Sequence, residues 1–188
     1  MPVDVDVHQD LIELVPSEYD RWRRQFRTER VRDALPGHLD DVVRIEHVGS
    51  TAVPDLAAKD VVDLDVVVAS GAVPTVARAL ADRLGGIRAE NGPTWHPVFR
   101  RSEGQRFNDH VFDRDAPGWK VSVVTRDVLR LDPARRRAYE SRKRELAAAT
   151  DDLERYSRGK TSFIAETLAT ARDEARLAYP FEIPHLEG

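Results

Sequence analysis

The spacing of apolar side chains along the chain alternates between helical and strand-like segments. In several segments the apolar residues recur every three or four positions, as expected for a helix with one buried face. Capping residues or proline near the start and glycine or proline after the end mark the boundaries of these segments. We predict helices at residues 17–35, 73–84, 132–150 and about 161–175.

Shorter apolar runs rich in valine, isoleucine and phenylalanine predict strands. The run at residues 61–69 is too short for most helices, and its only polar members are Asp63 and Asp65, so we expect a central strand there. Further strands are predicted at residues 42–48, 87–90, 98–101, 107–112 and 121–125. The whole pattern predicts one α+β domain over residues 1–188, with a mixed β-sheet flanked by helices and a C-terminal tail at 178–188.

Composition narrows the classes of function. The 188 residues carry a net charge of −4 and contain no cysteine, which excludes disulfides, thiolate metal sites and cysteine nucleophiles. No apolar run approaches membrane-spanning length, and residues 1–10 are acidic and do not resemble a secretion signal, so we expect a cytoplasmic protein with no membrane partner. Residues 100–160 hold 16 basic and 11 acidic side chains, which favours an anionic ligand near that half.

Two carboxylates lie two residues apart in the predicted central strand. Alternate residues of a strand face the same side, so Asp63 and Asp65 point one way, while Val62, Leu64 and Val66 point the other. Two like charges on a buried strand repel each other and resist desolvation, which calls for a cation between them. Mg²⁺, with Mn²⁺ as the alternative ion, prefers such oxygen ligands. An exposed sheet edge with solvated or arginine-paired aspartates is the other interpretation.

A turn of Gly49, Ser50 and Thr51 follows the strand at residues 42–48 and precedes a short helical segment running to about Lys59. Backbone N–H groups at such a turn can hold a phosphate, with help from the hydroxyl groups. On its own the turn is equally an ordinary capped turn. A Gly-Ser turn about a dozen residues before an Asp-x-Asp strand is the order found in phosphoryl or nucleotidyl transfer on a nucleoside triphosphate.

These residues also carry a family resemblance. The stretch from Arg44 to Pro54, followed by residues 56–59 and by Val62-Asp63, resembles the GrpB family. Later landmarks agree, including Trp119 and the sequence Gly159-Lys160-Thr161, and the resemblance covers about residues 11–170, the expected core of the domain. GrpB proteins occur alone or fused to dephospho-CoA kinase. The resemblance implies a nucleotidyltransferase fold of the DNA polymerase β type.

The resemblance also implies site residues. Gly49 and Ser50 would form the Gly-Ser turn of that superfamily, and Asp63 and Asp65 would be its metal-binding carboxylates. The usual His-x-His of the family is Asn108-Asp109-His110 here, so only His110 remains as a catalytic candidate. A third carboxylate, common in active nucleotidyltransferases, could come from Asp109 or Asp113, and the sequence leaves this choice open.

Two substitutions relative to the family pattern add negative charge beside the proposed phosphate site. Asp55 stands where glycine is usual and Asp60 where proline is usual. Both could indicate a different substrate or weakened catalysis. Glu46 and His47 face opposite sides of one strand, so at most one of them can join the site directly.

Lysines and arginines supply the remaining candidates. Lys59 and Lys160 are expected to offset phosphate charge. Gly159-Lys160-Thr161 resembles the end of a P-loop, but Glu154 stands where that motif needs glycine, so we reject a P-loop. The triplets at residues 135–137 and 142–144 share a broad helix face with interleaved glutamates, which favours a solvated, salt-bridged surface over a nucleic-acid stripe.

The leading expectation is a magnesium-dependent nucleotidyltransferase-like enzyme acting on a nucleoside triphosphate and a small-molecule acceptor. Asp63, Asp65 and His110 would be its catalytic residues, and Gly49, Ser50, Thr51, Lys59 and Lys160 would bind the phosphates. The alternative is a noncatalytic domain that binds a nucleotide, a coenzyme A-related ligand or a partner protein. RNA modification is a third reading, which rests on the arginine-rich helix alone.

Overall fold

The computed structural model describes residues 12–28 and 31–186, and the expectation about residues 1–10 lies outside the described residues. Its centre is a five-stranded sheet in the order β1-β2-β5-β4-β3. β2 and β5 pair in parallel and the other neighbours are antiparallel, so the predicted mixed sheet is confirmed. The strands are β1 (Val42–Val48), β2 (Val61–Val68), β3 (Gly86–Arg88), β4 (Trp95–Ser102) and β5 (Gln105–Asp113).

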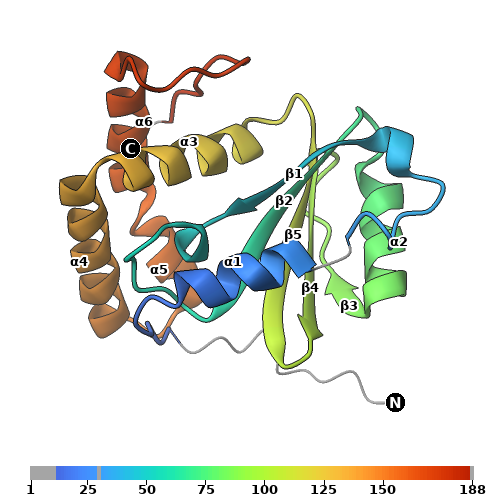
Figure 1. Cartoon of the computed structure of the whole chain (residues 1–188), viewed down its shortest axis with the longest axis horizontal. Helices are drawn as coiled ribbons and strands as arrows, with labels where there is room; N and C mark the ends of the chain where they lie inside the picture. The colour runs from blue at the N-terminus through green and yellow to red at the C-terminus, as the bar shows by residue number, and fades with distance from the viewer. Residues whose placement is uncertain (1–11, 29–30, 187–188) are drawn as a thin grey trace.

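Helices lie on both sides of this sheet (Figure 1). They are α1 (Tyr19–Thr28), α2 (Val73–Leu84), α3 (Pro117–Leu131), α4 (Pro133–Ala149), α5 (Leu153–Arg158) and α6 (Thr161–Asp173), with 3₁₀ turns η2 (Leu39–Asp41) and η3 (Ser50–Ala52). α2 packs beside β3 and β4, whereas α3 contacts β1 and β2 and joins α4, α5 and α6 in a separate group, the helical half (Figure 1). No helix in the described ranges is long and apolar enough to cross a membrane.

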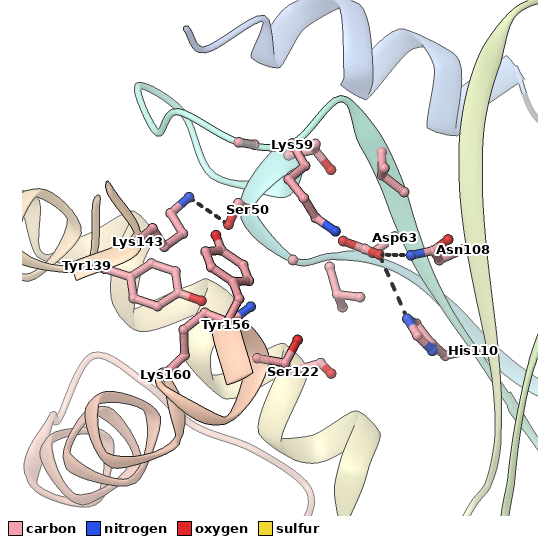
Figure 2. Close-up of a pocket in the computed structure, with 16 residues that line it drawn as sticks. Ser50, Lys59, Asp63, Asn108, His110, Ser122, Tyr139, Lys143, Tyr156 and Lys160 are labelled. Atoms are coloured by element: carbon pink, nitrogen blue, oxygen red, sulfur yellow. Dashed lines mark hydrogen bonds and ion pairs between the residues drawn. The ribbon is translucent and has the colours of Figure 1, made fainter. Parts of the chain in front are cut away.

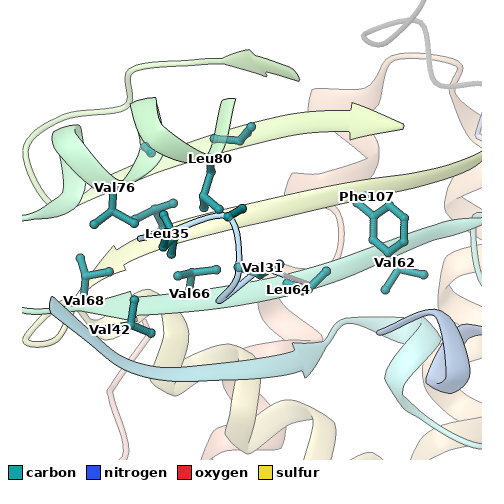
Figure 3. Close-up of a cluster of buried hydrophobic side chains, with 14 of the residues drawn as sticks. Val31, Leu35, Val42, Val62, Leu64, Val66, Val68, Val76, Leu80 and Phe107 are labelled. Atoms are coloured by element: carbon teal, nitrogen blue, oxygen red, sulfur yellow. The ribbon is translucent and has the colours of Figure 1, made fainter. Parts of the chain in front are cut away.

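The alternation of residues along β2 divides the interior between two faces. Val62, Leu64 and Val66 share one face, as predicted, and are buried in one cluster with Val76 and Leu80 of α2 (Figure 3). The opposite face packs against α3, where Val67 and Phe112 meet Trp119 and Val123. The two aspartates of β2 share this second face, which places them beside the helical half.

One predicted strand is wrong, because residues 121–125 belong to α3. Pro117 stands at the start of this helix, where its missing N–H removes no hydrogen bond, and the chain then continues as one helix to Leu131. Val123, Val124 and Val128 are buried at helical spacing. The β-branched run at residues 121–125 is therefore the first part of a longer apolar stripe on one face of the helix.

Other boundaries also shift. Within the described residues, the first helix ends at Thr28, and Val31 and Leu35 enter the core from turns. The segment from Gly49 to Lys59 has only the short η3, and α5 was not predicted at all. The helix predicted at 132–150 is confirmed, with the Asp132 carboxylate accepting the backbone N–H groups of the first turn.

The described part of the C-terminal tail packs on the helical half. Tyr179 and Phe181 stack on each other with ring centroids 5.0 Å apart, and Phe181 meets Trp119 edge to face at 4.9 Å. The residues after α6 therefore extend the cover over α3.

Candidate functional site

A cavity of about 310 Å³ opens where the end of β1 and the start of β2 face α4, α5 and α6 (Figure 2). Its wall joins strand residues to helix residues from the far end of the sequence. The lining residues are Val48, Gly49, Ser50, Thr51, Ala58, Lys59, Val61, Asp63, Asn108, His110, Ser122, Tyr139, Lys143, Tyr156, Ser157 and Lys160. Most of the residues predicted from the sequence are thus brought together, and Asp65 is the exception.

Gly49 fits its position for two physical reasons. Its φ of 70° lies in the left-handed region that favours glycine. A Cβ atom at this position would also collide with the Oδ2 atom of Asp63. The turn after β1 therefore lies directly against the carboxylate of β2, and Ser50 and Thr51 continue the cavity wall through η3.

Asp63 and Asp65 share a face of β2 but differ in environment. The Asp63 side chain is 27% exposed, and its Oδ1 atom accepts a hydrogen bond of 3.1 Å from Asn108 Nδ2. Asp65 is 0% exposed, and neither of its carboxylate oxygens has a hydrogen-bond partner among the described residues. Burial raises the pKa of Asp65 to about 7, against the opposing effects of the nearby His110 and of the Ser122 hydroxyl group, which lies outside hydrogen-bond geometry.

The donor set fits one divalent cation of the magnesium type. Unpartnered, buried carboxylate oxygens require a proton or a cation, and Mg²⁺ is commonly bound through one or two carboxylates with water and substrate phosphate in the other positions. Within residues 12–28 and 31–186 no group of three or more histidine, aspartate or glutamate side chains could hold a metal ion. Glu46, opposite Asp65 on β1, is paired with Arg126 at 2.8 Å.

Both candidates for a third carboxylate, Asp109 and Asp113, lie outside the cavity lining. Asp109 points to the opposite face of β5 and forms a buried pair with Arg100, whose Nη2 atom lies 3.0 Å from Oδ1. Asp113 accepts hydrogen bonds from Ser70 and from the backbone N–H of Gly71 at the other end of the strand. Neither carboxylate reaches the cavity.

Asn108 and His110 stand on β5 opposite Asp63 and Asp65, so both face the cavity. The Nδ1 atom of His110 lies 3.3 Å from Trp95 Nε1, which donates to it, so the proton of a neutral ring is on Nε2. Nε2 faces Asp63 Oδ1 at 3.8 Å. Burial lowers the pKa of His110, but the surrounding aspartates outweigh it and the net shift is upward, which favours a ring that holds Asp63 in place.

Three lysines line the cavity, and for one of them, Lys143, the predicted location is wrong. Lys143 was assigned to a solvated surface, but it is 2% exposed, donates a 3.0 Å hydrogen bond to Ser50 Oγ, and also donates to the carbonyl oxygen of Ala57. It lies one helical turn after Tyr139, so both side chains leave the same face of α4 toward the cavity (Figure 2). That i, i+4 pair is the sequence signal for the contribution of α4, and the flanking arginines obscure it.

The protonation of the lysines reflects their shared enclosure. Burial lowers the pKa of Lys143 to about 7 and that of Lys160 to about 8, and repulsion adds to both, from Lys160 on Lys143 and from Lys59 on Lys160. Burial also lowers the pKa of Lys59, although Asp63 acts in the other direction. An anion in the cavity would relieve this repulsion.

Two buried tyrosines complete the wall between the lysines. The Lys160 Nζ atom lies 4.5 Å from the ring centroid of Tyr156, and Lys143 Nζ lies 5.2 Å from that of Tyr139. Burial raises the pKa of both phenols, that of Tyr156 to about 12, so the hydroxyl groups stay protonated and can donate hydrogen bonds. Tyr156 and Ser157 reach the cavity from α5, a helix that the sequence pattern did not predict.

The two extra aspartates lie outside the cavity lining. Asp55 is 84% exposed and lies 3.6 Å from Arg136 Nη2. Asp60 accepts hydrogen bonds of 2.8 Å from both Arg21 and Trp22, which ties α1 to the start of β2. Their charge therefore does not face a phosphate in the cavity directly.

Neither residue of the Glu46-His47 pair lines the cavity. Glu46 is held by Arg126, whereas His47 stacks on Phe26 with ring centroids 5.0 Å apart and lies within hydrogen-bond distance of Thr51 Oγ1 at 3.1 Å. Burial lowers the pKa of His47 to about 4, so it is neutral at physiological pH. Both residues support the turn from outside the cavity.

Three arginines of α4 make contacts inside the chain. Arg142 donates to the carbonyl oxygen of Gly159, Arg144 pairs with Glu140 at 2.8 Å, and Arg136 donates to the carbonyl oxygen of Leu129. The predicted salt-bridged surface therefore describes Arg144, whereas Lys143 in the same triplet is buried in the cavity wall.

Comparison with known proteins supplies the family. The family described as GrpB protein matches residues 11–170. The chain belongs to the GrpB family. It is 34% identical to a UPF0157 protein of Deinococcus radiodurans, over 86% of this chain and 84% of that protein. A dephospho-CoA kinase of Mycolicibacterium paratuberculosis is 29% identical over 87% of this chain but only 47% of its own length.

The fold of the family is also represented among solved structures. The crystal structure of the conserved protein GrpB from Enterococcus faecalis superimposes with a TM-score of 0.71 over 86% of this chain and 98% of that chain. At 24% identity this likeness concerns the fold, a five-stranded mixed sheet with helices on both sides.

Proposed function

We propose that this GrpB protein is a magnesium-dependent, nucleotidyltransferase-like enzyme acting on a nucleoside triphosphate and a small-molecule acceptor. The observation that carries the proposal is the composition of the cavity. A Gly-Ser turn, the Asp63 carboxylate and three lysines from separate elements line one space of about 310 Å³. That combination suits a polyphosphate bound beside a cation.

The lysines give the cavity its preference for anions. Lys59, Lys143 and Lys160 face a single carboxylate among the lining residues, that of Asp63. In a partly enclosed space, charges interact several times more strongly than in bulk water. The hydroxyl groups of Ser50 and of the two tyrosines add neutral donors for phosphate oxygens.

Asp63 and Asp65 would hold the magnesium ion, which when bound supplies positive charge to the transferring phosphate. Other residues of the chain would position the Asp63 carboxylate and the Gly-Ser turn. His110 and Asn108 hold the Asp63 carboxylate from β5, and Lys143 holds Ser50 and the Ala57 carbonyl at the turn. A nucleophile on the acceptor would then attack the α-phosphate and pyrophosphate would leave.

The proposal is tested by calorimetric titration of the four common nucleoside triphosphates with and without Mg²⁺, followed by assays of pyrophosphate release with pooled acceptors. We expect saturable binding that Mg²⁺ strengthens at least tenfold, and loss of that strengthening in Asp63→Asn and Asp65→Asn. Asp55→Asn removes the same charge outside the cavity and is the matched control. Equal binding with and without Mg²⁺, or none at all, would contradict the proposal.

One observation favours the second candidate, a noncatalytic domain for a nucleotide or coenzyme A-related ligand. The positions on β5 that face Asp63 and Asp65 are Asn108 and His110, so a third carboxylate is missing from that strand face. Saturable, Mg²⁺-dependent binding without pyrophosphate release, with every pooled acceptor, would support this candidate. RNA modification predicts a steep salt dependence of RNA affinity, which a titration at two salt concentrations measures.

A further inference from the structure

A second, smaller cavity of about 160 Å³ adjoins the first. The two share Gly49, Ser50, Ser122 and Tyr139 as lining residues, so they meet at the Gly-Ser turn. The second cavity extends from there toward α3 and α6. The two cavities are therefore neighbours on either side of the same four residues.

The deeper part of this cavity is apolar. Its walls include Val121 and Leu129 of α3 and Ile164 of α6. Arg126 also lines it, but its guanidinium donates to Glu46, to Asp127 and to the carbonyl oxygen of His47, so it is already paired. Unlike the first cavity, this one has no lysine or carboxylate among its lining residues.

One polar atom in this apolar wall lacks a partner. The Oγ1 atom of Thr125 is buried and makes no hydrogen bond among the described residues. Thr167 and Thr170 of α6 instead donate to the carbonyl oxygen four residues earlier, the usual solution for a helical threonine. An unpartnered hydroxyl in a cavity wall costs stability unless a ligand meets it.

We propose that the second cavity binds a compact, largely apolar ring of the acceptor, with one polar ring atom that meets Thr125 Oγ1, while phosphate occupies the first cavity. This inference rests on the proposed function and names the class of acceptor. A cavity of about 150 Å³ is known to hold a benzene ring, so the volume fits a single six-membered ring. A nucleobase has several polar atoms along its edge, whereas among the described lining residues beyond those shared with the first cavity the only unpartnered hydroxyl is that of Thr125, which favours the acceptor as the occupant.

The test uses small phosphate esters as probes, measured by calorimetry on the full chain. Inorganic pyrophosphate reports on the first cavity alone, methyl phosphate adds a group too small for the second, and benzyl phosphate adds a ring. We expect benzyl phosphate to bind at least tenfold more tightly than methyl phosphate. Thr125→Leu should remove that difference by filling the cavity and leave the affinity for pyrophosphate unchanged, whereas Thr170→Leu on α6 should leave all three affinities unchanged.

A second variant tests the effect of the Thr125 hydroxyl group separately from the effect of side-chain volume. Thr125→Val keeps the shape, so benzyl phosphate should bind as in the wild type, whereas pyridylmethyl phosphate should lose about fivefold or more. Thermal melts report whether each variant folds, and the valine variant remains informative if the leucine variant does not. Equal affinities for benzyl and methyl phosphate in the wild type, with pyrophosphate still binding, would overturn this inference alone. Absence of both pyrophosphate and Mg²⁺-nucleotide binding would overturn the proposed function as well.

Discussion

Replacing Lys143 with methionine should make the protein more stable near neutral pH while weakening its hold on phosphate. Methionine has a similar length without the charge, and the position is 2% exposed. In the wild type the ammonium group is placed in a space where burial and Lys160 both oppose its charge. Removing the Lys143 ammonium group therefore removes an unfavourable contribution to the free energy of folding.

The magnitude follows from the pKa of the lysine. Burial lowers it from 10.5 to about 7, and at about 1.4 kcal/mol per pH unit this is about 4 to 5 kcal/mol against folding when the group is charged in both states. Lys143→Met also leaves Ser50 and the Ala57 carbonyl without their donor, at a cost of about 1 to 3 kcal/mol. We expect a net gain of about 2 kcal/mol at pH 6, or about 4 to 8 °C in Tm.

The sign of the pH dependence distinguishes this explanation from simple repacking. The folded pKa lies below that of the unfolded chain, so between about pH 7 and 10.5 the unfolded state binds more protons and wild-type stability rises with pH. The destabilisation by the buried, charged lysine is fully present below pH 7 and is absent above pH 10.5. From pH 6 to pH 10, the wild type should therefore gain about 3 to 4 kcal/mol relative to Lys143→Met.

The assay is urea unfolding of both proteins at pH 6, 8 and 10, with circular dichroism as the signal. Lys120→Met is the matched control, because Lys120 lies over the rings of Trp119 and Phe181, outside the cavity lining. A difference between wild type and Lys143→Met that is the same at all three pH values would refute the reasoning, since the lysine would then be charged or neutral throughout.

Three further substitutions test the framework of the site. Gly49→Ala should cost about 2 kcal/mol or more in urea unfolding, because strain at positive φ adds to a collision with the neighbouring carboxylate, whereas Gly71→Ala, with a φ of 84° and open space around it, should cost only about 1 kcal/mol. Asp109→Ala should destabilise by about 3 to 5 kcal/mol, because it leaves the buried Arg100 without its carboxylate; a loss below 1 kcal/mol in the same assay would contradict this. Leu168→Ala should lower the free energy of unfolding by about 2 to 5 kcal/mol through a cavity in the helical half, and unchanged stability would show that this half does not unfold with the sheet.

The central strand of the sheet was predictable because apolar and polar residues alternate along it with a period of two. Along β2, Val62, Leu64 and Val66 alternate with the two aspartates, and that period of two predicts both the strand and the side to which each residue points. Residues 121–125 carry an equally β-branched run, yet they are helical. These residues are helical because the apolar stripe continues to Val128 and packs against α6. A window of five residues shows neither feature.

Close spacing in the sequence made the Gly-Ser turn and the first carboxylate predictable, whereas His110 and Lys160 were predicted mainly through the family resemblance. Gly49, Ser50 and Asp63 lie within fifteen residues of one another, and both the chemistry and the family resemblance point to them. Lys143 is 93 residues from Ser50, and its contact exists only because α4 folds back over the turn. Its neighbours Arg142 and Arg144 bond to the carbonyl oxygen of Gly159 and to Glu140 of the same helix, so the charge pattern of this helix does not reveal which cation faces inward.

The division of charge between the two halves of the molecule argues for one composite ligand. The sheet contributes carboxylates, of which Asp65 has no hydrogen-bond partner among the described residues, and the helical half contributes Lys143 and Lys160, which repel each other. A bound cation alone would neutralise the carboxylates but add to the repulsion between the lysines. A bound polyphosphate alone would neutralise the lysines but be repelled by the Asp63 carboxylate. A cation bound together with polyphosphate satisfies both sets. Mg²⁺ and tripolyphosphate should therefore strengthen each other's binding by the same factor, as linkage requires, and independent binding in a two-way titration would show that the two halves do not form one site.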